Sequence, residues 1–102
     1  MRLEIITRME RNEALGGVQN AIRQSGGWIV NHTLFSNISA TLQFEVPAQA
    51  TDDLVKRLTE FGLPPALQSE VPPTAKEDIR GTVLLTFIHD ESDLKRPVPA
   101  FG

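Results

Sequence analysis

The residues from Ile38 to Val46 alternate strictly between apolar and polar side chains. Successive side chains of a β-strand point to opposite faces of a sheet, so this rhythm predicts a strand with one buried face and one solvated face. A similar alternation runs from Leu3 to Met9, and residues 81–89 are mostly apolar. A chain with such segments is expected to build a sheet, and the segments between them must supply what covers it.

Two segments between these strands have a helical period instead. In the first, Asn12 is the predicted N-cap and Gly26 follows the last turn. In the second, Thr51 is the predicted N-cap and Gly62 ends the helix. Apolar side chains recur at helical spacing in both, namely Leu15, Val18, Ala21 and Ile22 in the first and Leu54, Val55, Leu58 and Phe61 in the second.

Residues 28–46 are predicted to form a hairpin with its turn at Ser36 and Asn37. A three-residue loop would pair Leu34 with Ile38, whereas a two-residue turn would shift the register by one residue. The first register turns Trp28, Val30 and His32 inward, and the second turns Ile29, Asn31, Thr33 and Phe35 inward. We favour the first register because it leaves fewer polar groups in the core.

The resulting order of elements is strand, helix, strand, strand, helix, strand. It predicts an α+β fold of the ferredoxin-like βαββαβ type, with a four-stranded antiparallel sheet and two helices on one face. A chain of 102 residues suits one domain. We place this domain at residues 1–92, with a Pro-rich connector at 63–78 and an extended tail at 93–102.

Composition excludes several kinds of function. A net charge of -3 and a pI near 5.3 give no basic surface for phosphates, so no nucleic-acid partner is expected. The absence of cysteine excludes thiol catalysis, disulfide bonds and thiolate metal sites. The sequence has no apolar run long enough for a membrane span and no signal peptide, so we expect no membrane association and a cytoplasmic location.

The stretch from Glu10 to Leu15, followed by Val18, Gly26 and then Trp28, resembles the first helix and second strand of ACT regulatory domains. These are small βαββαβ modules that often pair and bind amino acids near the first loop and helix. The resemblance covers about the first half of the chain and implies an ACT-like regulatory domain. Glu13 departs from it, because the family usually has a glycine there that lets a ligand approach the backbone.

The predicted ligand site lies between the first loop and helix, at Asn12, Glu13, Gly16 and Gly17, and Asn31 on the second strand. Adjacent glycines at a helix start can offer free backbone N–H groups to an anion, or can allow a close approach of a neighbouring segment. We predict no catalytic residues, no metal ligands and no cofactor.

The leading functional hypothesis is a non-catalytic module that binds a small molecule or regulates another protein. A homodimer is expected, because Ile6 and one side of the last strand give the open face of the sheet an apolar character. The alternative is a protein-interaction module that uses this open face and the Pro-rich segments. An enzyme using His32 or His89 is a third hypothesis, although no second histidine or cysteine is spaced to share a metal with His32.

Overall fold

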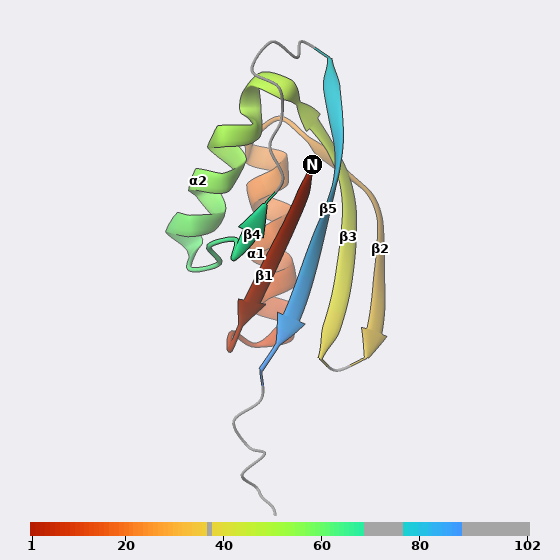
Figure 1. The fold of residues 1–102 in the computed structure, drawn as a ribbon, viewed down its shortest axis with the longest axis vertical. Helices are drawn as coiled ribbons and strands as arrows, with labels where there is room; N and C mark the ends of the chain where they lie inside the picture. Colours follow the sequence, from red (N-terminus) through yellow and green to blue (C-terminus); the bar gives the residue numbers. More distant parts are fainter. Residues whose placement is uncertain (37, 69–76, 89–102) are drawn as a thin grey trace, which may run out of the picture.

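In the computed structural model, which describes residues 1–36, 38–68 and 77–88, five strands form one sheet and two α-helices lie on one of its faces (Figure 1). A short 3-10 helix, η1, precedes the second α-helix. In chain order the elements are β1 (Arg2–Thr7), α1 (Arg11–Gln24), β2 (Trp28–Ser36), β3 (Ser39–Pro47), η1 (Ala48–Ala50), α2 (Thr51–Phe61), β4 (Leu67–Gln68) and β5 (Asp78–Phe87). The α+β class and the two helices on one face are therefore confirmed.

The strand order is β2-β3-β5-β1-β4, so the last strand of the chain occupies the centre of the sheet (Figure 1). β5 is antiparallel to β3 from Ser39, opposite Thr86, to Pro47, opposite Asp78. On its other side β5 is parallel to β1. The prediction of a four-stranded, wholly antiparallel sheet is wrong in this respect, and the strand order is no clear match to a ferredoxin-like sandwich.

The central place of β5 has a physical reason in its sequence. Val83 and Leu85 are fully buried toward the helices, while Leu84, on the opposite face, is half-buried between Thr41 of β3 and Glu4 of β1. Both helices lie on the other face, so Leu84 is shielded by the two neighbouring strands, and apolar residues at consecutive positions suit a strand with a neighbour on each edge. Alternation along one strand reports its faces but not its neighbours, so the sheet order could not follow from it.

Part of the predicted Pro-rich connector, residues 63–78, is built into the domain. The backbone N–H of Ala66 donates to the carbonyl of Glu4 at 2.6 Å, and β4 then pairs antiparallel with the outer edge of β1. This edge is therefore partly covered by a very short strand. Residues 69–76 and the predicted tail at 93–102 lie outside the described residues.

Both α-helices end where the sequence predicts, but both begin earlier, and the N-cap of α2 is Ala50 and not Thr51. The carboxylate of Glu10 accepts hydrogen bonds from the backbone N–H groups of Asn12 and Glu13, both at 3.0 Å, so the N-cap is Glu10 and not Asn12. Gly26 and Gly62 follow the helices with φ of +90° and +102°, a conformation that side chains with a Cβ rarely adopt.

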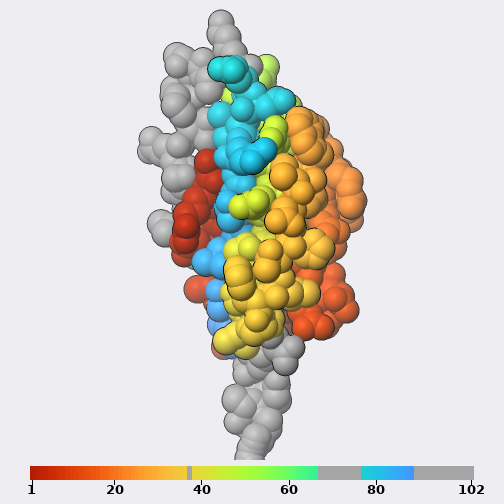
Figure 2. Space-filling model, turned by 90° about the vertical axis from the view of Figure 1, so that its right-hand side faces the viewer, coloured from red at the N-terminus to blue at the C-terminus, as the bar shows by residue number. Residues whose placement is uncertain are grey.

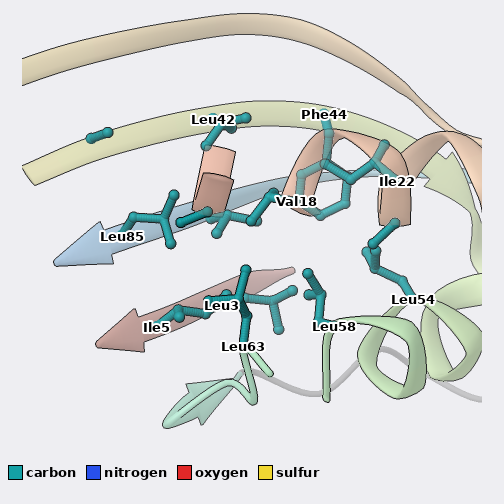
Figure 3. Packing of buried hydrophobic residues seen from close by; sticks show 14 of the residues in the cluster. Leu3, Ile5, Val18, Ile22, Leu42, Phe44, Leu54, Leu58, Leu63 and Leu85 are labelled. Atoms are coloured by element: carbon teal, nitrogen blue, oxygen red, sulfur yellow. The ribbon is translucent and has the colours of Figure 1, made fainter. Parts of the chain in front are cut away.

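The core lies between the sheet and the two helices (Figure 3). It receives alternate residues of β1, β3 and β5 and the inner faces of α1 and α2. Its large, fully buried side chains are Leu3, Ile5, Val18, Ile22, Leu42, Phe44, Val46, Leu54, Leu58, Leu63, Val83 and Leu85. None of them comes from β2, although β2 is one of the longer strands.

The register of the β2–β3 hairpin is not the one that we favoured. Ser36 pairs with Ser39, and Leu34 pairs with Ala40 rather than with Ile38. One register shift lies between Ile29 and Asn31, at Val30, and a second lies between Leu34 and Ser36. Neither alternative for β2 has a buried face in the structure, because all its residues are exposed except the half-buried Ile29. The number of buried polar groups therefore does not distinguish the two registers.

Candidate interaction surface

The structure does not bring the predicted ligand residues together. Asn12 and Glu13 are exposed in the first turn of α1, with Gly16 one turn further along the same helix. Asn31 of β2 pairs with Gln43 of β3, which points away from the helices because its neighbours in the strand are core residues. Asn31 therefore lies on the open face of the sheet, and α1 lies on the other face.

The two adjacent glycines of α1 have different surroundings. A Cβ at Gly17 would overlap the ring of Phe61 on α2, whereas a Cβ at Gly16 would meet nothing within 4 Å. Gly17 therefore allows α1 and α2 to pack closely, which was one of the two roles considered for this pair. The backbone of Gly17 is buried under this ring in a helix–helix contact and is not open to an anion.

Metal-ligating groups do not cluster in the part of the chain that the structure describes. No three histidine, aspartate or glutamate side chains lie close enough there to hold a metal ion. His32 is exposed on β2, which fits an edge histidine, and His89 lies outside the described residues. Neither α-helix has the length and apolar character that a membrane span requires among the residues described.

The open face of the sheet is mainly polar. Rows of neighbouring residues cross it from strand to strand, such as Asn31, Gln43 and Thr82. Ile6 is 57% exposed on this face, but its neighbour on β5 is Thr86. Ion pairs also lie on it, between Arg2 and Glu4 at 3.0 Å and between Arg80 and Glu45 at 2.6 Å. The apolar open face on which we based the homodimer is therefore not a continuous patch.

Exposed apolar side chains gather instead along β2 and at the turn that follows it. Figure 2 shows β2 and the start of β3, in orange to yellow, along the side of the molecule that faces the viewer. Eight large hydrophobic side chains of the described residues are strongly exposed, and five of them belong to this region. These five, with their exposed fractions, are Trp28 (45%), Val30 (41%), Leu34 (46%), Phe35 (65%) and Ile38 (54%).

β2 is also an edge strand, because β3 is its only neighbour among the described strands. One row of its backbone N–H and C=O groups therefore faces away from the sheet. Proteins usually protect such an edge with charged residues, with proline or with a very short strand. β2 is nine residues long and contains no proline and no aspartate, glutamate, lysine or arginine. Its only irregularities of the protective kind are the two register shifts.

The absence of charge extends beyond β2. No aspartate, glutamate, lysine or arginine occurs between Arg23 and Glu45, a segment that holds all of β2 and most of β3. Glu45 lies opposite Trp28 at the start of β2, and its carboxylate is paired with Arg80. The edge is consequently uncharged along its length, so another extended chain can approach it without losing the solvation of an ion.

We refer to the β2 edge and its exposed apolar side chains, Trp28, Val30, Leu34, Phe35 and Ile38, as the β2 edge surface. Sequence reasoning missed this surface because it assigned one face of β2 to the core. The sequence nevertheless contains a signal for this surface, which is the run of uncharged residues in a chain that is 23% charged. Such a run is typical of a strand that is buried or that acquires a partner.

Among the residues that the structure describes, the two carboxyl groups with a lowered pKa, those of Glu10 and Asp53, lie away from this surface. Hydrogen bonds from the backbone of Asn12 and Glu13 lower the pKa of Glu10. The pKa of Asp53 is lowered mainly by its hydrogen bond from Arg57. Both shifts have a structural cause at the start of a helix and indicate no acid–base chemistry.

Comparisons with protein-family models, with curated proteins and with solved structures found no match. A function for this chain therefore has to be inferred from the β2 edge surface.

Proposed function

We propose that this chain is a non-catalytic protein-interaction module that binds an extended segment of a protein by adding it as a strand beside β2. The observation that carries the proposal is the nine-residue edge strand that is uncharged, proline-free and exposed along nearly its whole length. In strand addition the backbone hydrogen bonds supply much of the affinity, and the side chains at alternate positions supply specificity.

Three features of the β2 edge surface support this mode of binding. The neighbouring strand β3 has one buried face, to which Leu42 and Phe44 belong, and its pairing with β2 holds β2 in the sheet. The outward row of backbone groups on β2 is a set of donors and acceptors that a protein strand can satisfy. The exposed side chains Leu34 and Phe35 offer apolar area that a partner can remove from water, at about 25 cal/mol per Å² buried.

The other hypotheses have less support. A small ligand at Asn12 to Gly17 and Asn31 remains a prediction, because these residues are separated between α1 and the open face of the sheet. An ACT-like or ferredoxin-like relationship also remains a prediction. The addition of a strand beside β2 neither requires nor excludes such a relationship. The interaction function was our alternative from the sequence, and the proposed surface moves from the open face to the β2 edge.

Photo-crosslinking in cells tests the proposal. We would replace Phe35 with a photoreactive phenylalanine analogue and compare it with the same analogue at Glu60, which is exposed on α2. The proposal predicts a discrete protein adduct from position 35 that is absent from position 60. The adduct should also be lost when Leu34→Lys is added to the same chain, because a charge on the edge opposes strand addition.

Two results would contradict the proposal. One is the absence of any discrete adduct from position 35 in a folded chain. The other is an adduct that persists unchanged with Leu34→Lys, since contact at position 35 would then not depend on the edge. The circular dichroism spectra of all variants would be compared with that of the unmodified chain to verify the fold.

A further inference from the structure

We infer that the partner that adds to β2 is a second copy of this chain, paired antiparallel with β2 of the first copy about a twofold axis at His32. This inference rests on the proposed function and names its partner. The two sheets would then join through their β2 strands into one continuous sheet.

The sequence of β2 is self-complementary about His32. In an antiparallel pair centred on this residue, each position faces the position equally far on the other side of the centre. Val30 then faces Leu34 of the other copy, and Asn31 faces Thr33. Apolar residues meet apolar residues and polar residues meet polar residues. A shift of the register by one residue, which would place Val30 opposite Thr33, loses this match.

The local geometry allows the centre of this pairing, with Val30 at the first register shift. Residues 31–34 pair regularly with β3 between the two register shifts, so the centre of β2 is a regular strand. His32 and Leu34 lie on the helix-side face, because their partners in β3 are the core residues Leu42 and Ala40. They are nonetheless exposed, so no element of the described chain covers this part of the sheet. A second copy would supply neighbouring side chains at this position.

Electrostatics also favours a second copy over a charged partner strand. The chain has a net charge of -3, so two copies repel each other at a distance, and an interface between them needs a surface without acidic groups. The segment from position 24 to position 44 has this property, because it has no aspartate or glutamate and no lysine or arginine. In a twofold interface each residue faces the same or the symmetry-related residue of the other copy. A strand without charged residues can therefore pair with itself without placing like charges opposite each other.

Sedimentation equilibrium of the full chain, with a pair of complementary substitutions, tests both the partner and the register. Val30→Lys and Leu34→Glu each place a charge opposite an apolar residue of the other copy and should weaken the dimer on the order of tenfold or more. Combined in one chain, they bring a lysine and a glutamate opposite each other twice. The double variant should recover most of the dimer affinity that each single variant loses.

Ile6→Lys is the matched control, because Ile6 is a similarly exposed apolar residue on a strand, but on the open face and away from β2. It should leave the dimer affinity within about twofold of the unmodified chain. Because Val30 and Leu34 are also exposed, none of the substitutions removes a core side chain, and circular dichroism would verify the fold of each variant.

A chain that stays monomeric at all accessible concentrations would overturn the inference, as would single and double variants that are weakened equally. Loss of the dimer with Ile6→Lys alone would also overturn it and would assign the interface to the open face. These outcomes are distinct from failure of the proposed function. If the crosslink at position 35 joins a different protein, strand addition at β2 stands and only the identity of the partner is wrong.

Discussion

The backbone of Gly17 on α1 lies directly against the aromatic ring of Phe61 on α2, so closely that a Cβ on Gly17 would overlap the ring. This contact joins the two helices that cover the sheet. Phe61 is 44% exposed, so its ring lies at the surface end of the helix pair and shields the backbone of α1 there. A glycine that costs helix stability is thus tolerated because it allows the helices to approach.

The two adjacent glycines therefore make opposite predictions. Gly16→Ala should stabilise the domain by about 0.5–1 kcal/mol, because alanine favours the helix and its Cβ enters open space. Gly17→Ala should destabilise it by about 1–2 kcal/mol, because the ring of Phe61 has to move and loses its packing. Urea unfolding followed by circular dichroism measures both. Equal effects of the two substitutions would contradict the close helix contact.

A double-mutant cycle tests whether the loss at position 17 comes from this ring. In a Phe61→Ala background, Gly17→Ala should no longer destabilise the domain, because the overlapping ring is absent and only the gain in helix propensity remains. A loss of the same size in both backgrounds would show that another contact of Gly17 is responsible.

Two phenylalanines of the hairpin should respond very differently to substitution. Phe44 on β3 is fully buried and Phe35 on β2 is 65% exposed. Phe44→Ala should cost about 3–5 kcal/mol, a large part of the stability of a small domain. Phe35→Ser should cost less than about 0.5 kcal/mol in the monomer. Chemical unfolding at low protein concentration compares them, and a large loss at Phe35 would indicate that β2 is buried within one chain.

The stability of the domain should fall in acid partly because of Asp53. The hydrogen bond from Arg57 Nε, at 2.7 Å, lowers the pKa of this carboxyl below the usual 3.8, so folding favours the ionised form. Its contribution to stability is therefore present above the unfolded pKa and is lost as the pH falls through the lower folded pKa. Asp53→Asn should lower the melting temperature near neutral pH, and the difference should vanish in strong acid.

Asp52→Asn is the control for this pH dependence. Asp52 is exposed in the same first turn of α2, so its substitution removes the same charge from the helix N-terminus without removing the bond to Arg57. The difference between the two variants then reports the interactions that Asp53 makes with Arg57 and with Ser25. A melting difference between Asp53→Asn and Asp52→Asn that stays constant down to strong acid would contradict the assignment.

Much of the fold could be predicted from local patterns. The ends of the helices at Gly26 and Gly62 follow from the conformation that only glycine adopts easily, and the strand at β3 follows from its alternation. The N-cap of α1 was wrong by two residues because a glutamate, which is not a preferred cap, reaches two backbone N–H groups at that position. Such a choice depends on the local geometry and not on the type of residue.

The arrangement of the strands and the candidate surface could not be predicted in the same way. The sequence shows apolar residues on both faces of β5, such as Val83 and Leu84, but only the pairing with β1 and β3 decides its place in the sheet and its direction. On β2 the apolar residues were assigned to the core, whereas the helices cover β3, β5 and β1 instead. A pattern of hydrophobicity shows which residues avoid water but not whether the same chain or a partner covers them.

Hydrogen–deuterium exchange of the β2 backbone at low and at high protein concentration tests the account most directly. If β2 adds to β2 of a second copy, the amides of residues 28–36 should exchange more slowly at high concentration, while those of β1 and β5 should not change. With Leu34→Lys the exchange of β2 should no longer depend on concentration. Exchange of β2 that is the same at both concentrations in the unmodified chain would contradict the account.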